Sequence, residues 1–519
     1  MDTGKTNIQV AECPDGSKEI EARIRQAVEE FIRFIRDDAG DLRLVDFERA
    51  LWSRMTALFR LGVKMFLALR HERLDLSRYE AEGWRVKKAF ATRTIKTLGG
   101  AVTYGRAYLR RNGDGWFPLD ALLGITADGF SWRVIDLVTR LAARVSYGAT
   151  QDIMRAMLGW SPSTEAIEAL VIGLGRRAPD FMAAQQPLDD DGEVLIIETD
   201  GKAAPMATEA ELEARRQKRK HGRKCGCGCQ RHRGRKRRKG KKEQRKKRKK
   251  RGHNSKNGRS ATLTAMYTLR RGEDGKLHGP INKKVWGRFG PRRDAIACAR
   301  DHATRRGFGP ETDKTIQIVI DGERCLRKEL GKQFPYAVMT LDLRHAQERL
   351  WKTGRLFHEE ASPELEQWVE PLNRLLLGGR VETLVKRLKK ILKSIPLRGP
   401  NTKNKRKTLS EQIAYFEERK EMMHYDQYYQ EDLVLATGVI EGACRYVVGE
   451  RLDCSGMRWK LEGAEPLLQL RCIELNGDWD QFIAWASDQT TAELKNGKLV
   501  KIRHPRPKPQ SKSTRKQAA

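Results

Sequence analysis

The sequence predicts an α/β fold: a mixed five-stranded sheet flanked by helices, preceded by a mainly helical N-terminal part. Two observations carry this prediction. From residue 193 onwards, five apolar or alternating runs have the length of strands, and the last three are separated by helical segments. Before residue 185, apolar residues recur mostly at the 3.6-residue period of helices.

The first part of the chain divides into two predicted regions. Residues 1–90 are expected to form a helical N-terminal region. Residues 91–185 are expected to form a small DNA-binding region, with a β-hairpin around Gly99-Gly100 and then helices. A break near residue 160 allows a helix-turn-helix, but the helix that follows, 164–173, has acids and no Lys or Arg. That composition favours helix packing over the reading of DNA bases.

Residues 190–475 are expected to form the catalytic domain. It carries a basic disordered insertion, 208–258, and a helical insertion, 359–430. The predicted strands are 193–199, 261–269, 284–289, 315–320 and 337–341, and the helices between and after them are 291–306, 324–334 and 343–358. The ribonuclease H-like fold has this order of elements, and its first and fourth strands lie side by side.

Two acids directly follow the strands that this order makes neighbours. Asp200 follows the first strand and Asp321 follows the fourth, and sites on α/β sheets lie beyond the C-terminal ends of strands. Each acid precedes glycine, and an Asp-Gly pair taken alone indicates a turn more often than a catalyst. The expected adjacency of the two strands is what favours a shared site.

A third acid, Glu441, lies at the margin of a predicted helix. The residues expected on the buried side of that helix are Ile440, Ala443, Cys444, Val447 and Val448. Glu441 can instead form a surface pair with Arg445 four residues on. The pattern alone does not choose Glu441 over Glu450 or Asp453.

Three carboxylates at one sheet edge suit two Mg²⁺ ions, with Mn²⁺ as a substitute. Two such ions support in-line displacement at a phosphodiester. The predicted catalytic and metal-binding residues are therefore Asp200, Asp321 and Glu441.

The charge of the chain points to double-stranded DNA as the partner. The net charge is +34, and residues 215–251 contribute 23 Lys or Arg against one acid. A second basic and disordered segment is predicted at 500–519. Such runs bind polyanions, although a solvated run without a partner is the alternative. The predicted DNA contacts are Arg235, Lys236, Arg237, Arg238, Lys246, Lys247 and Arg248.

The nine cysteines form no disulfide-like framework, which suits a reducing compartment. Cys225, Cys227, Cys229 and His232 are candidate zinc ligands. Their C-x-C-x-C spacing differs from the C-x₂₋₄-C spacing of structural zinc sites, so zinc is not expected. The cysteines expected as ordinary core residues are Cys298, Cys325, Cys444, Cys454 and Cys472. No signal peptide or membrane span is predicted, so a cytoplasmic protein without a membrane partner is expected.

Most of residues 90–475 resembles insertion-sequence transposases of the ISKra type, members of the DDE superfamily with a ribonuclease H-like core. The motifs that carry the resemblance are DGKAAPM (200–206), VIDGE (319–323), LDLRH (341–345), GVIE (438–441) and SGMRW (455–459).

The resemblance implies a bacterial, nucleoid-associated DNA transposase that cleaves and joins the ends of an insertion sequence, acting as a homo-oligomer on DNA. It places the catalytic triad on Asp200, Asp321 and Glu441. The implied substrate contacts are Asp342, His345, Arg458 and Trp459; for His345, packing at the start of its helix is the equal alternative. A structure-specific nuclease on the same core and an inactive basic nucleic-acid-binding protein are the alternatives.

Overall fold

The computed structural model describes residues 16–186, 191–208, 258–454, 457–497 and 501–503, with residues 211, 213 and 217. The chain forms two compact units. Unit 1 combines Met1–Phe181 with Trp479–Ala519, and unit 2 is Met182–Asp478. Helix α8 (Ala178–Ala184) spans the boundary between them.

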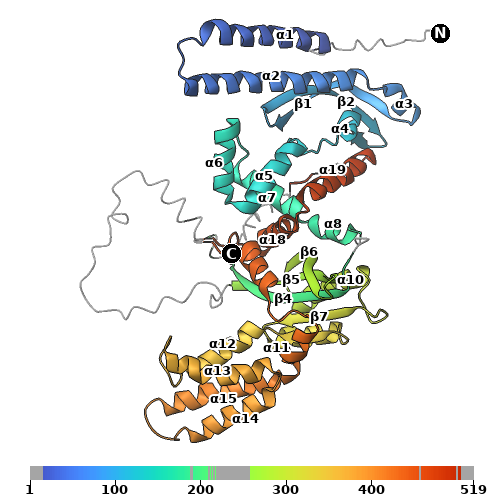
Figure 1. The fold of residues 1–519 in the computed structure, drawn as a ribbon. Coiled ribbons are helices and arrows are strands. Elements are labelled where there is room, and N and C mark those ends of the chain that lie inside the picture. The colour runs from blue at the N-terminus through green and yellow to red at the C-terminus, as the bar shows by residue number, and fades with distance from the viewer. Residues whose placement is uncertain are drawn as a thin grey trace, which may run out of the picture. The chain divides into compact units, whose positions relative to one another are not determined.

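Unit 2 is built on a five-stranded mixed sheet with the order β6-β5-β4-β7-β8 (Figure 1). Its strands are β4 (Val194–Pro205), β5 (Gly258–Arg271), β6 (Leu277–Phe289), β7 (Thr315–Ile320) and β8 (Val338–Leu341). The pairs β4–β5 and β5–β6 are antiparallel, whereas β4–β7 and β7–β8 are parallel. The mixed α/β class, the five strands and the adjacency of the first and fourth strands are therefore confirmed.

Strand β4 is longer than the sequence pattern predicts. It was expected to end at Asp200-Gly201, but it pairs with β5 without interruption from Val194↔Leu269 to Pro205↔Gly258. Asp200-Gly201 is therefore part of a strand. The turn propensity of the Asp-Gly pair is overridden here by a continuous antiparallel ladder.

Helices cover the sheet and extend unit 2. Helices α10 (Arg292–Arg305) and α11 (Arg324–Gln333) follow β6 and β7 in the chain, and α12 (Leu343–Gly354) follows β8. The predicted helical insertion contains α13 (Pro363–Leu377), α14 (Val381–Ser394), α15 (Thr402–Glu418), the 3₁₀ turn η2 (Lys420–Met422) and α16 (Tyr425–Gln430). The unit closes with α17 (Gly438–Ala443), the π-helical turn η3 (Cys444–Gly449) and α18 (Leu461–Leu475).

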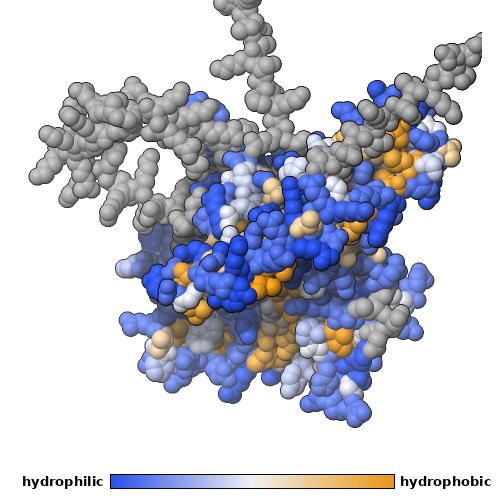
Figure 2. All heavy atoms as spheres, turned by 90° about the horizontal axis from the view of Figure 1, so that it is seen from above, coloured by the Kyte–Doolittle hydropathy of each residue, from blue (hydrophilic) through white to orange (hydrophobic). Residues whose placement is uncertain are grey.

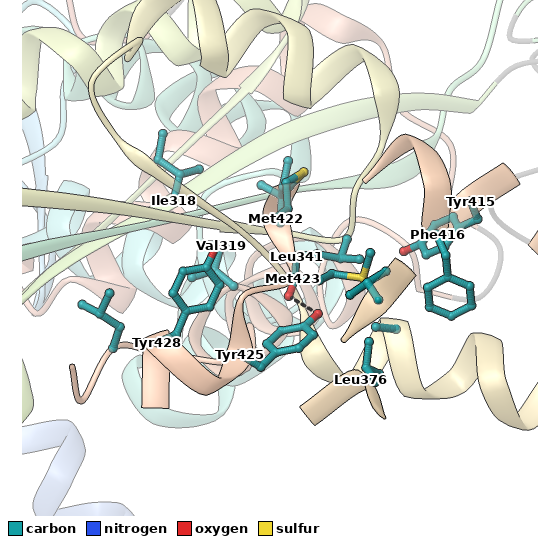
Figure 3. Close-up of a cluster of buried hydrophobic side chains, with 14 of the residues drawn as sticks. Ile318, Val319, Leu341, Leu376, Tyr415, Phe416, Met422, Met423, Tyr425 and Tyr428 are labelled. Carbon is teal, nitrogen blue, oxygen red and sulfur yellow. Dashed lines mark hydrogen bonds between the residues drawn. The ribbon is translucent and has the colours of Figure 1, made fainter. Parts of the chain in front are cut away.

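The helical insertion shares one hydrophobic core with the sheet. Figure 3 shows Ile318, Val319 and Leu341 of the strands among aromatic side chains of the insertion. The buried hydroxyl of Tyr425 donates a 2.8 Å hydrogen bond to the carbonyl of Leu341. Because this bond joins the insertion to the end of β8, the insertion supports the sheet edge at which strands β7 and β8 end.

Unit 1 begins with a helical hairpin and a β-hairpin. Its first elements are α1 (Ser17–Arg33), the π-helical turn η1 (Phe34–Asp38), α2 (Leu44–Glu72), α3 (Leu76–Ala81), β1 (Arg85–Thr97), β2 (Gly100–Arg111) and β3 (Asp114–Trp116). The hairpin turn predicted at Gly99-Gly100 joins β1 and β2. The predicted division at residue 90 falls inside β1. Leu67 of α2 packs against Ile95 and Tyr104 of the β-hairpin, so the two predicted regions share a hydrophobic cluster.

The remaining helices of unit 1 are α4 (Pro118–Leu122), α5 (Trp132–Arg144), α6 (Tyr147–Leu158), α7 (Thr164–Gly175) and α19 (Trp479–Lys495). The side chain of Ser163 caps α7 by accepting a hydrogen bond from the N–H of Ala166. The chain returns to this unit at its C-terminal end. Residues 501–503, within the predicted basic tail, are held here: Ile502 is buried and its N–H donates to Asp128 at 2.5 Å.

Seen from above, most of the surface drawn in colour is hydrophilic, with hydrophobic side chains gathered in a few places (Figure 2). Within the described ranges, none of the helices combines the length and the apolar composition needed to cross a bilayer.

The prediction that the cysteines lie in the core is wrong for two of them. Cys444 and Cys472 are buried, but Cys298 and Cys325 are exposed. Cys298 lies on the outer side of α10, whose inner side is formed by Ile296 and Ala299.

Candidate functional site

The parallel pairing of β4 and β7 brings Asp200 and Asp321 to equivalent positions. The ladder between these strands ends at Glu198↔Val319. Asp200 and Asp321 each come two residues later, so the two carboxylates leave the same sheet edge at the same level. The adjacency that the sequence pattern predicts for these acids is present in the structure.

The loop that carries Asp321 is held in one conformation. Oδ1 of Asp321 accepts a 2.8 Å hydrogen bond from the N–H of Glu323. Gly322 has a φ of 80°, a conformation that other residues rarely adopt. From the helical insertion, Tyr415 donates its hydroxyl to the carbonyl of Asp321 at 3.1 Å, and Arg419 donates to the carbonyl of Gly322 at 2.8 Å. The insertion therefore fixes the backbone on which Asp321 stands.

Glu441 is in the first turns of α17, and two buried carboxylates hold the beginning of that helix. Glu198 accepts a 2.8 Å hydrogen bond from the N–H of Ile440. Asp342 accepts one of 2.9 Å from the N–H of Thr437 and another from its hydroxyl. The N–H groups of a first helical turn have no partner within the helix, so these acids satisfy groups that burial would otherwise leave orphaned. Together they fix the backbone immediately before Glu441.

Glu198 and Asp200 are two residues apart in β4 and therefore face the same side of the sheet. That side meets the segment of Glu441, because Glu198 contacts Ile440 and the thiol of Cys444 lies 3.7 Å from Oδ2 of Asp200. Burial raises the pKa of Cys444, so this residue stays a neutral thiol beside the carboxylate.

Asp200, Asp321 and Glu441 line one cleft, with a volume of about 680 Å³. The other residues of its wall are Gly201, Lys202, Ser260, Arg292, Glu323, His345, Cys444, Arg445 and Gly449. The three acids predicted from sequence thus converge on one cavity, although they come from positions up to 241 residues apart in the chain.

Asp342 is committed to structural hydrogen bonds. One of its oxygens caps α12 by accepting from the N–H groups of Arg344 and His345, and the other accepts from Thr437. Burial alone would raise the pKa of Asp342, but the hydrogen bonds from His345 and Thr437 outweigh it and hold the pKa at about 2. The carboxylate is therefore charged and already saturated with donors.

His345 lies in the wall of the cleft, with Nδ1 3.4 Å from Oδ2 of Asp342. The interaction with Asp342 raises the pKa of His345 to about 9, against the lowering effect of burial. His345 therefore faces the cleft beside Asp342, which caps its helix.

Carboxylate oxygens are the ligands that Mg²⁺ prefers, and the three acids of the cleft are such ligands. Within the described residues, donor atoms of Asp342, His345 and Glu441 lie within 4.8 Å of one another. Asp342 is saturated with protein donors, so Glu441 and His345 are the members of this group that remain available to a metal ion. Asp200, Asp321 and Glu441 supply the carboxylate oxygens that Mg²⁺ prefers, but within the described residues they do not form a group whose ligand atoms all lie within 4.8 Å of one another.

Two cations of the cleft were missed by the sequence analysis. Lys202 is two residues after Asp200 in β4, so the strand period could have placed it on the same face. Arg292, in the first turn of α10, is paired with Glu323, and nothing in the sequence pattern indicates that it reaches the site. Glu198 was also missed, because it stands in an apolar run and its partners come from distant segments.

The alternative partner of Glu441 is otherwise engaged: Arg445 forms an exposed ion pair of 3.4 Å with Glu450. Of the two predicted substrate contacts near residue 458, Arg458 is exposed. Trp459 is buried, and its indole N–H donates to the carbonyl of Leu452 at 2.8 Å. The ring of Trp459 therefore packs inside the protein, and Arg458 is the residue of this pair that can reach a ligand.

Several predicted residues lie outside the described part of the chain. They are the DNA contacts Arg235, Lys236, Arg237, Arg238, Lys246, Lys247 and Arg248, and the zinc candidates Cys225, Cys227, Cys229 and His232.

Comparison with protein-family models gave no match, and comparison with curated proteins gave none either. The inference of function therefore depends on the chemistry and geometry of the cleft, together with the charge of the chain.

Proposed function

We propose that this chain is a DNA transposase that cleaves and joins phosphodiester bonds, with Asp200, Asp321 and Glu441 as ligands of two Mg²⁺ ions. The observation that carries the proposal is the convergence of these three acids in one cleft, two of them at equivalent positions of adjacent parallel strands. A five-stranded sheet with this order is compatible with a ribonuclease H-like core, the fold that the resemblance to ISKra-type transposases implies.

When bound, two Mg²⁺ ions supply activation of the attacking oxygen and neutralisation of charge on the phosphate and leaving oxygen. The protein's own groups bind and orient the DNA. Lys202, Arg292 and His345 bring positive charge to the same cleft, where a phosphate carries its negative charge. Acids for metal and cations for phosphate in one cavity are the combination that phosphoryl transfer requires.

The attachment of the basic insertion supports DNA as the substrate. The paired residues Pro205 and Gly258 flank the insertion, and Lys202 and Ser260 near them line the cleft. Residues 215–251, with 23 Lys or Arg, are therefore joined at both ends to strands that form the cleft wall. Positive charge tethered at this position raises the local concentration of DNA beside the acids.

The test is a strand-transfer assay on the purified protein. The donor is the DNA that flanks the coding region, cut to expose a 3′-hydroxyl, and the target is a supercoiled plasmid. We expect a joined product in Mg²⁺ or Mn²⁺ and none in Ca²⁺, because a larger ion with a looser coordination shell does not hold the same geometry. Hydrolysis without joining would instead identify a structure-specific nuclease. DNA binding without either reaction, unchanged by loss of the three acids, would identify a non-enzymatic binding protein.

A further inference from the structure

Helix α2 carries a row of large apolar side chains on its surface. The exposed stripe of α2 consists of Val45, Trp52, Met55, Phe59 and Phe66, each between 45 and 52 % exposed. Four of them recur every seven residues, and Met55 follows Trp52 by three. This is the a/d spacing of a coiled-coil seam, which in a soluble protein is normally covered by another helix.

The covered sides of α2 lie elsewhere. Figure 1 shows α2 between α1 and the β1–β2 hairpin. On the side of α1, Phe47 stacks on Phe34 with 5.9 Å between ring centroids. On the side of the β-hairpin, Leu67 packs against Ile95 and Tyr104. The exposed stripe is thus additional to these two contacts, except that one edge of Phe59 lies against Gly99 in the turn between β1 and β2.

Gly62 lies beside the stripe in the middle of α2. Glycine inside a helix costs about 1 kcal/mol relative to alanine. A Cβ at Gly62 would meet nothing within 4 Å, so packing among the described residues does not require a glycine here. A second helix that approaches closely at this point would require one.

We propose that the exposed stripe of α2 binds the same stripe of a second copy of this chain, with the two α2 helices antiparallel. The stripe suits a two-fold pairing, because Val45 of one copy then faces Phe66 of the other and Trp52 faces Phe59. The stripe spans 22 residues, whose 21 steps of 1.5 Å make about 32 Å.

The exposed apolar area of the stripe is about half that of a standard interface. Its five side chains, three of them aromatic, are about half exposed and contribute on the order of 400 Å² per partner. A standard stable interface buries about 800 Å² per partner, so the pairing needs flanking side chains as well. Other large apolar side chains exposed on α1 and at the start of α2 are Val28, Ile32, Ile35, Leu42 and Leu44.

One pair of charges at the ends of α2 favours the antiparallel pairing. Exposed charges of both signs stand at both ends: Asp41, Arg43, Glu48 and Arg49 near the N-terminal end, and Arg70, Glu72 and Arg73 near the C-terminal end. In the antiparallel arrangement that pairs Val45 with Phe66, Asp41 faces Arg70 of the other copy. A parallel arrangement would place like charges together. Acids and bases alternate along α1 and α2, which favours a protein partner over DNA for this face.

The test is the mass of the full chain in solution without DNA, measured by light scattering and sedimentation at high salt, which screens contacts through the basic insertion. We expect twice the 59.4 kDa of one chain. Trp52→Glu should raise the dissociation constant by about tenfold or more. Met157→Glu is the matched control, because Met157 is an exposed apolar residue of α6 outside the stripe, and this variant should remain dimeric.

A charge exchange tests the antiparallel pairing without removing apolar area, and it remains informative if Trp52→Glu does not fold. Asp41→Arg and Arg70→Asp should each weaken the dimer, and the double variant should restore it. A wild-type chain that runs at 59.4 kDa would overturn the proposal. So would a Trp52→Glu variant that keeps its mass but loses DNA affinity, because the stripe would then be a DNA surface. This proposal does not depend on the activity proposed above.

Discussion

The buried carboxylate of Glu198 accepts a 2.8 Å hydrogen bond from the backbone N–H of Ile440, the residue directly before Glu441. Its other oxygen accepts one of 2.7 Å from the hydroxyl of Tyr267. Glu198 therefore joins the first strand of the sheet to the helix of the third predicted catalytic acid. We regard it as a positioning residue for Glu441, because its bonds are made to other protein groups.

Glu198→Ala should reduce the cleavage rate by about 10- to 100-fold, because a small displacement of a catalytic group is costly. Glu198→Gln keeps an acceptor for Ile440 and should retain most of the activity. Tyr267→Phe is the control, because it removes the other hydrogen bond of Glu198 and leaves the one to Ile440. Titration of Mn²⁺ by calorimetry should show weaker binding to Glu198→Ala than to Tyr267→Phe. Equal affinities would mean that Glu198 only stabilises the fold.

The two Asp-Gly pairs should respond differently to alanine. Gly322 has a φ of 80°, and a Cβ there would lie 2.6 Å from Cδ1 of Leu341. Gly201 lies in a strand, and a Cβ there would approach the mobile hydroxyl of Ser260 at 2.9 Å. We expect Gly322→Ala to lower the free energy of unfolding by about 2 kcal/mol or more, and Gly201→Ala by less than about 1 kcal/mol. Denaturant titration measures both, and equal losses would contradict the difference in backbone conformation.

Asp191 should make unit 2 sensitive to acid. Its carboxylate accepts two hydrogen bonds of 2.7 and 2.8 Å from the guanidinium of Arg306, and both side chains are almost buried. Burial alone would raise the pKa of Asp191, but Arg306 and Thr268 outweigh it and lower the pKa from 3.8 to about 2. A pKa that is lower in the folded state stabilises the fold above about pH 4, and this stability is lost as the pH falls towards 2.

Asp191→Asn should therefore lower the free energy of unfolding by about 2 kcal/mol at pH 7. The difference from wild type should shrink between pH 4 and pH 2, where the native carboxyl also becomes protonated. Denaturant titrations across this range measure it. A difference that stays constant down to pH 2 would show that the charge of Asp191 does not stabilise the fold.

Deletion of residues 215–251 should weaken DNA binding about equally for all sequences. A short Gly-Ser linker can replace them, because the flanking residues Pro205 and Gly258 are paired neighbours. Each lost phosphate contact should reduce the slope of log affinity against log salt by about 0.9. Binding isotherms at several salt concentrations measure the slope, with deletion of residues 504–519 as a comparison. An unchanged slope would show that the insertion does not contact DNA.

The sequence pattern predicts the strands best where apolar runs end at a clear boundary. Strand β7 has the predicted bounds, because Thr315–Ile320 is a β-branched run that stops at Asp321-Gly322. Strand β4 runs on past its predicted end because β5 pairs with it as far as Pro205, a long-range effect that no local signal reports. Strand β6 begins at Leu277, before the predicted Lys284, for the same reason.

The acids of the site could be predicted because strand order alone brings Asp200 near Asp321. The groups that orient them could not, since the long-range partners of Glu198, Asp342 and Tyr415 are 69 to 242 residues away in the chain. The spacing in the sequence allows Glu441 either to pair with Arg445 at the surface or to reach the catalytic site. The π-helical turn that begins at Cys444 changes the spacing of side chains after Glu441, and Arg445 pairs with Glu450 instead.

The most direct test of the central claim compares the cleavage rates of Glu441→Gln and Glu450→Gln on DNA that carries the flanking sequences, in Mg²⁺ and in Mn²⁺. Glu441 lies in α17 and lines the cleft with Asp200 and Asp321, whereas Glu450 directly follows η3, does not line the cleft and forms an exposed pair with Arg445, a residue of the cleft wall. We expect Glu441→Gln, like Asp200→Asn and Asp321→Asn, to lose several orders of magnitude in rate while DNA binding and folding persist. Glu450→Gln should lose about tenfold or less. Near-normal cleavage by Glu441→Gln, or loss of cleavage by Glu450→Gln alone, would contradict the assignment of the three acids to one catalytic site.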